Sequence, residues 1–236
     1  MMPAAAGLAL GYGLAAAVAV MGGSRSLRPW LLVAFAAGSI AFPLTVFLVF
    51  SIQLLLASLF GWGPDAIAMT LGPGLAGAVV TATVNEVFTL AAALLAWRLS
   101  RGGAPYAFGA AAGAGFAVVG AYQVIHLALM ARALPISSAS AFGVSLLQQL
   151  AFVAANTAST ALAALGAARG RGGAYLVAAI LFQSVFLAFG LLYALRLYSN
   201  VVWTALELTA AAALVVGVLI LDRRRPAGDA ALPSAA

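Results

Sequence analysis

The chain has 236 residues, of which 65% are hydrophobic and only 7% are charged. A water-facing surface needs about a quarter or more charged residues, so this composition excludes an ordinary soluble globule and indicates a protein surrounded mostly by lipid. The net charge of +6 is interpreted as a marker of membrane topology rather than of nucleic-acid binding. The chain has neither lysine nor cysteine, which excludes Schiff-base lysines, P-loops, thiolate nucleophiles and cysteine-based metal sites.

Apolar runs separated by glycine, proline and arginine divide the chain into about seven segments long enough to cross a bilayer. They are predicted at 4–22, 30–60, 71–97, 106–131, 140–168, 174–195 and 201–221. The second run contains Pro43 and is predicted as one kinked helix; two spans with a turn there are the alternative, but no charged or loop residue interrupts the run. We therefore predict an all-α, polytopic protein of the cell membrane, with a seven-helix transmembrane domain over 1–221 and a short disordered tail over 222–236.

The arginines predict an orientation. Nine of the eleven follow the odd-numbered runs, namely Arg25, Arg28, Arg98, Arg101, Arg169, Arg171, Arg223, Arg224 and Arg225. Only Arg132 and Arg196 fall on the other side. Because loops rich in arginine stay in the cytoplasm, the N-terminus is predicted outside and the C-terminus in the cytoplasm.

Few polar side chains interrupt the apolar runs. The third run carries Glu86 beside a stripe at helical spacing, Thr81, Asn85 and Thr89. Later runs add Ser145, Gln149, Asn156, Thr160, Gln183 and Ser184. At 1.5 Å per residue, Glu86 and Asn156 lie about 18 Å and Gln183 about 14 Å from the cytoplasmic helix ends, so we expect them to meet near the bilayer centre. A carboxyl there costs about 3 kcal/mol on insertion scales, so Glu86 needs a partner or a proton.

Glu86 has two interpretations that the sequence leaves equally weighted. In the functional interpretation, Glu86 is a catalytic acid or base, a proton carrier or a ligand. In the structural interpretation, Glu86 holds helices together by hydrogen bonds. For His126 and Glu207 we favour structural roles, with Glu207 paired to Arg196 near the outer surface. A catalytic zinc site needs about three protein ligands, and the candidates in the apolar runs lie at different depths. An aspartyl dyad needs two aspartates, and no predicted span contains one. A Ser–His pair needs a serine in a nucleophile elbow, which the sequence does not offer. We therefore predict neither a metal nor a cofactor.

Five segments occur in an order that resembles the PrsW/YhfC group of CAAX-protease-like intramembrane proteases. They are 74–77 (GLAG), 85–89 (NEVFT), the glycine-rich 109–120, 148–156 (QQLAFVAAN) and 178–183 (AAILFQ). The resemblance implies that Glu86 is retained from an E-E-x-x-R motif, in which Asn85 and Thr89 replace the first glutamate and the arginine. It also implies that a G-H-G-x-x-E element has become apolar at Ala114 and Val118, and that Asn156 and Gln183 replace two late histidines.

The stretch 85–88 also resembles the anterior-pharynx-defective scaffold subunit of γ-secretase, which has seven spans and no catalytic role. We therefore predict a non-catalytic pseudo-protease that acts as a scaffold or binding subunit for other integral membrane proteins. Its polar cluster is predicted to contain Asn85, Glu86, Thr89, Gln149, Asn156 and Gln183. Two alternatives stay open: an active intramembrane peptidase in which Glu86 activates water, and a transporter or proton pathway through Glu86.

Overall fold

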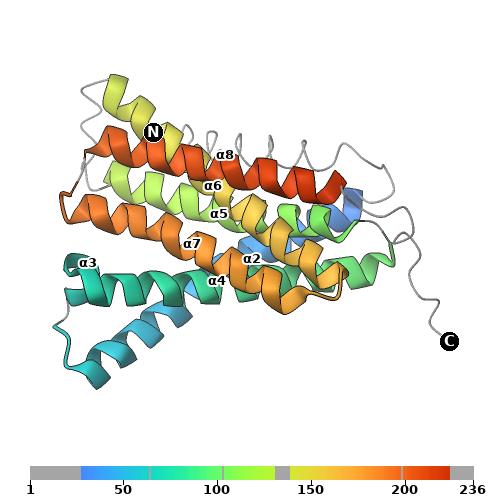
Figure 1. Ribbon diagram of the computed structural model, residues 1–236, viewed down its shortest axis with the longest axis horizontal. Coiled ribbons are helices and arrows are strands. Elements are labelled where there is room, and N and C mark those ends of the chain that lie inside the picture. The colour runs from blue at the N-terminus through green and yellow to red at the C-terminus, as the bar shows by residue number, and fades with distance from the viewer. Residues whose placement is uncertain (1–27, 64, 103, 131–138, 198, 224–236) are drawn as a thin grey trace.

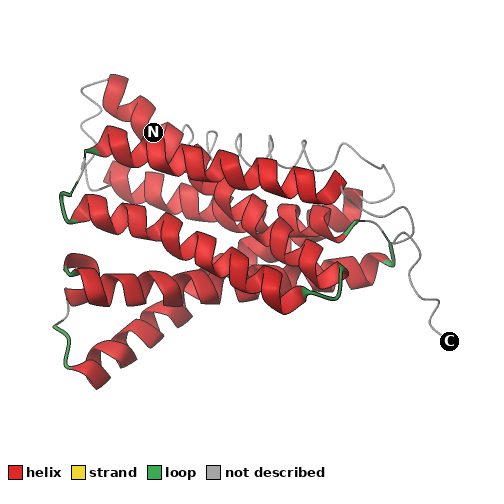
Figure 2. Ribbon diagram, viewed as in Figure 1, coloured by secondary structure: helices red, strands yellow, loops and turns green. Residues whose placement is uncertain are grey.

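The computed structural model describes residues 28–63, 65–102, 104–130, 139–197 and 199–223. Within these ranges every regular element is a helix, as Figure 2 shows. The elements are α2 (Arg28–Phe60), the short α3 (Ala66–Met69), α4 (Leu71–Ser100), α5 (Pro105–Met130), α6 (Ala139–Ala168), α7 (Gly172–Ala194) and α8 (Asn200–Arg223). The prediction of an all-α chain is therefore confirmed for the part that the structure describes.

Six of these helices, all except α3, are long and apolar enough to cross a bilayer, as in a multi-pass membrane protein. They correspond to the second to seventh predicted runs. The first predicted run, 4–22, lies outside the described residues, as does nearly all of the predicted tail. The prediction of one helix rather than two around Pro43 is confirmed, because α2 continues through this proline for 33 residues in all.

The helices α5 and α6 form the centre of the bundle. In their most apolar stretches 78% and 72% of the residues are buried, against 17–33% in the other four long helices. Helix α5 packs against α2, α4 and α6, and α6 packs against α7 and α8 as well (Figure 1). The outer helices expose large apolar side chains such as Phe47, Leu181 and Val216, as expected where the solvent is lipid.

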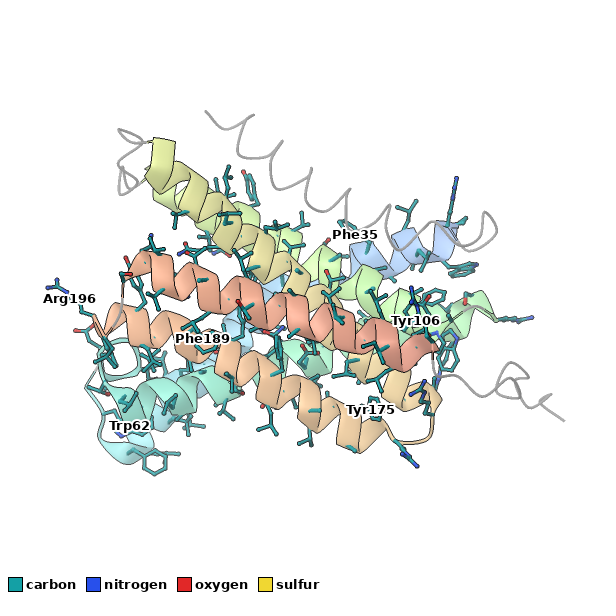
Figure 3. All side chains as sticks on the ribbon, turned by 45° about the horizontal axis from the view of Figure 1, so that its top comes forward. Phe35, Trp62, Tyr106, Tyr175, Phe189 and Arg196 are labelled. Atoms are coloured by element: carbon teal, nitrogen blue, oxygen red, sulfur yellow. The ribbon has the colours of Figure 1, made fainter. Side chains whose placement is uncertain are left out.

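Aromatic side chains mark both ends of the bundle. Figure 3 shows Trp62 and Arg196 at one end and Tyr106 and Tyr175 at the other. Trp62 lies two residues after the end of α2, and Tyr106 lies at the start of α5. Tryptophan and tyrosine favour the membrane–water boundary, so these residues agree with a bundle whose two ends lie at the two surfaces.

Glycines let α5 approach its neighbours closely. A Cβ atom added at Gly38 of α2 would lie 2.0 Å from the backbone oxygen of Ala112, and one at Gly115 of α5 would lie 2.0 Å from that of Phe35. The Ser39 hydroxyl donates to the Gly115 carbonyl across this contact, at 3.1 Å. Lipid provides no hydrophobic drive between helices, so close backbone packing and interhelical hydrogen bonds stabilise the α2–α5 pair.

We expect Gly38→Ala and Gly115→Ala each to lower the free energy of unfolding by about 1–3 kcal/mol, because the added methyl group forces the two backbones apart. Thermal unfolding in detergent measures the change. Gly217→Ala in α8 is the control, since a Cβ there meets nothing within 4 Å. Equal effects of all three substitutions would contradict a role for the close approach.

Candidate functional site

A cluster of buried polar side chains joins α4, α6 and α7 in the interior of the bundle. We call it the Glu86 cluster, and its members are Glu86, Thr89, Ser159, Thr160 and Gln183. Each is at most 3% exposed, although each carries polar groups that water would otherwise satisfy. Buried polar groups of this kind require hydrogen bonds within the protein.

Hydroxyl groups of α6 satisfy the Glu86 carboxyl. The Ser159 hydroxyl donates to Oε1 of Glu86, and the Thr160 hydroxyl donates to Oε2 at 3.4 Å. Nε2 of Gln183 in turn donates to the Ser159 hydroxyl at 2.9 Å, which brings α7 into the network. Both carboxyl oxygens therefore have partners, and one chain of hydrogen bonds connects three helices.

Thr89 adds a second link between α4 and α6. Its hydroxyl donates to the Asn85 carbonyl of its own helix at 2.8 Å, so it accepts from the Thr160 hydroxyl at 3.1 Å, and Thr160 shares its one proton between Thr89 and Oε2 of Glu86. Thr89 follows Glu86 by three residues, a spacing that places both side chains on one face of α4. The local sequence of α4 therefore presents an acceptor and a hydroxyl to the same turn of α6.

Three of the six residues predicted for the polar cluster lie in the Glu86 cluster: Glu86, Thr89 and Gln183. Asn156 is buried nearby, but its amide donates to the Phe152 carbonyl of its own helix at 2.8 Å. Asn85 is only partly buried. Gln149 has a buried Oε1 without a hydrogen-bond partner in the described part of the chain. The structure thus places the side chains of Asn85, Gln149 and Asn156 outside the hydrogen-bond network of Glu86, although the Asn85 and Asn156 backbone carbonyls accept bonds from Thr89 and Ser159.

Ser159 is the functional residue that the sequence reasoning missed. Serine is common in apolar helices and bonds its own backbone, so it carried no signal by itself. Its position beside Thr160 and three residues after Asn156 was the available clue, because these spacings place it close to the predicted stripe of α6.

The sequence predicted structural roles for Glu207, paired to Arg196, and for His126. Glu207 of α8 is buried, at 6% exposure, whereas Arg196 is exposed and lies at one end of the bundle (Figure 3). These two residues therefore do not form the expected ion pair. The side chain of His126 lies outside the described part of the structure.

The Glu86 cluster is enclosed by packed helices, since each of its side chains is at most 3% exposed. A groove of about 520 Å³ lies between α2 and α5, lined mainly by apolar side chains such as Phe42, Pro43 and Phe47. No residue of the Glu86 cluster lines it. Within the described residues, no three His, Cys, Asp or Glu side chains come together in a way that could hold a metal ion.

Comparison with known proteins yields no relative, since no family model, no curated protein and no solved structure matches the chain. The chemistry of the Glu86 cluster therefore has to be argued from its own geometry. A carboxyl group whose two oxygens accept hydroxyl hydrogen bonds in a closed interior is suited to holding helices in register.

Ser159→Ala is expected to destabilise the bundle by about 1–3 kcal/mol, because it removes the hydroxyl that donates to Oε1 of Glu86 and accepts from the Gln183 amide. Chemical or thermal unfolding in detergent measures this change. Ser184→Ala is the matched control, since Ser184 is also buried but bonds only the Ile180 carbonyl of its own helix, at 2.7 Å. A control variant destabilised as strongly as Ser159→Ala would contradict the interhelical role.

Proposed function

We propose that this chain is a non-catalytic, multi-pass protein of the cell membrane that acts as a scaffold or binding subunit for other integral membrane proteins. The intramembrane-protease architecture that its sequence resembles is part of this proposal, with the catalytic groups replaced. The observation that carries the proposal is the enclosure of Glu86, the one carboxyl of the predicted cluster, by hydroxyl donors of α6.

Catalysis by a carboxylate requires water and substrate within hydrogen-bond reach. Glu86 is 1% exposed, and both of its oxygens are occupied by Ser159 and Thr160. A proton pathway requires polar groups that continue toward both surfaces, whereas toward the arginine-rich end of α4 the next buried residues after Thr89 are Leu90, Ala93 and Ala96. Both alternatives are therefore less well supported than a structural role for this residue.

An amide in place of a histidine suits a scaffold. Gln183 donates a hydrogen bond to Ser159 without titrating near neutral pH and without the affinity for zinc that an imidazole has. Interhelical hydrogen bonds of this kind contribute about 0.6 kcal/mol on average in membranes, and up to about 1.7 kcal/mol. The network therefore fixes the register of α4, α6 and α7, and it leaves the lipid-facing surface of the bundle for partners.

Elemental analysis of the detergent-purified protein is expected to find no stoichiometric metal in either the natural chain or a Glu86→Gln variant. Glutamine keeps an oxygen acceptor for Ser159, so the variant is expected to remain folded. Stoichiometric zinc in the natural protein that is lost in the variant would contradict the proposal and restore a metallopeptidase.

Affinity purification from native membranes gives a second, independent test. Other integral membrane proteins are expected to co-purify in fixed stoichiometry, and equally with the natural chain and with Glu86→Gln. Cleavage of a co-purifying membrane protein by the natural chain but not by the variant would instead identify an active peptidase. Uptake of a proton or solute into sealed vesicles that Glu86→Gln abolishes would identify a transporter.

The proposed orientation places the N-terminus outside and the arginine-rich end in the cytoplasm. The absence of natural cysteines allows a direct test. Gly173→Cys at the start of α7 is expected to react with a membrane-impermeant maleimide only after the cells are permeabilised. Ser199→Cys, which precedes α8, is expected to react in intact cells. Both positions are exposed, so the reverse pattern would invert the orientation.

A further inference from the structure

One end of the bundle carries nearly all of the positive charge in the described part of the chain. The six long helices alternate in direction, so the start of α2, α5 and α7 and the end of α4, α6 and α8 share this end (Figure 1). The arginines there are Arg28, Arg98, Arg101, Arg169, Arg171 and Arg223, and Asp222 is the one acidic residue among the described residues of this end. At the opposite end the described charges are Asp65 and Arg196.

The turn between α6 and α7 holds one of these arginines in a fixed position. One guanidinium nitrogen of Arg169 donates to the Leu221 carbonyl of α8 at 2.6 Å, and the other donates to the Tyr175 hydroxyl at 3.4 Å. A guanidinium has five N–H donors, so these two bonds leave donors for a ligand. The bond to Leu221 also brings the last turn of α8, with Arg223, beside the turn that carries Arg171.

The space around this turn is open. Gly170 has a φ of +67°, and a Cβ atom added at Gly170 or at Gly173 would meet nothing within 4 Å. Arg171 and Arg223 are exposed. A ligand can therefore approach the turn, where one guanidinium is already positioned and two others lie on neighbouring segments.

We propose that Arg169, Arg171 and Arg223 bind the phosphate group of an anionic phospholipid. Arginine recognises phosphate through two parallel N–H donors, and basic groups at the ends of membrane helices attract anionic headgroups. The site lies where three spanning helices end or begin, which is the depth of the headgroups. Near the site, α8 exposes Leu219 and Ile220 and α7 exposes Val177, so both helices offer apolar side chains to acyl chains, which a free phosphate would not use.

Native mass spectrometry of the detergent-solubilised chain, titrated with phosphatidylglycerol or phosphatidylcholine, tests the site. The natural chain is expected to bind phosphatidylglycerol at least tenfold more tightly than phosphatidylcholine. Arg171→Gln and Arg223→Gln are each expected to weaken phosphatidylglycerol binding about fivefold, the factor that corresponds to about 1 kcal/mol for each basic residue near an anionic membrane. Arg196→Gln, at the opposite end, is the control and is expected to leave the affinity unchanged.

Both test variants are expected to fold, because no hydrogen bond of the Arg171 or Arg223 side chain occurs within the described structure. Competition with glycerol 3-phosphate separates the two sources of a phosphate group. A lipid site is expected to resist millimolar competitor, because glycerol 3-phosphate has no acyl chains. Displacement at that concentration would assign the site to a soluble phosphate. Equal affinity of the natural chain for the two lipids would overturn the proposal. So would an equal loss of phosphatidylglycerol affinity in Arg196→Gln and Arg171→Gln.

Discussion

The buried carboxyl of Glu86 is the constraint on which the arrangement of the helices depends. Inside a bilayer such a group costs about 3 kcal/mol on insertion scales, and an acceptor left without donors costs more. Ser159 and Thr160 of α6 supply the donors, and Gln183 of α7 supports Ser159. Sliding either helix by one turn would separate these groups by about 5.4 Å, so the carboxyl fixes the register of α4, α6 and α7.

Close packing of α5 against α6 occurs at the same level. A Cβ atom at Gly113 of α5 would lie 2.3 Å from the backbone oxygen of Asn156, and one at Gly109 would lie 2.5 Å from the backbone oxygen of Thr160. These are the turns of α6 that hold the donors for Glu86. The glycines of α5 thus let its backbone press against the same turns of α6 that bond the carboxyl, and side-chain volume on α5 would disturb both contacts.

A second polar contact ties α6 to α8 near the opposite end of the bundle from the arginines. The Gln148 amide donates to the Asn200 side-chain oxygen at 2.6 Å and to the Thr204 hydroxyl at 3.0 Å. Helix α6 is therefore held by hydrogen bonds at two depths, and small residues pack between them, including Ala151 and Ala155. This distribution of polar contacts agrees with the proposed scaffold role, in which the charged end and the lipid-facing surface are the places for interactions.

The sequence alone determined the helical class, the six described spans and the continuity of α2 through Pro43, because length, hydropathy and the lack of loop residues are local properties. Constant helical rise also predicted that Glu86 and Gln183 lie at similar heights, and in the structure both side chains bond Ser159. The sequence did not decide which neighbours meet. The buried face of α4 includes Ala82, Glu86 and Thr89, whereas Thr81 and Asn85 are only partly buried. The rotation of α4, and with it the pairing of Glu86 with Ser159, was decided by the tertiary structure, because helix rotation is set by the packing of neighbouring helices and not by any single helix.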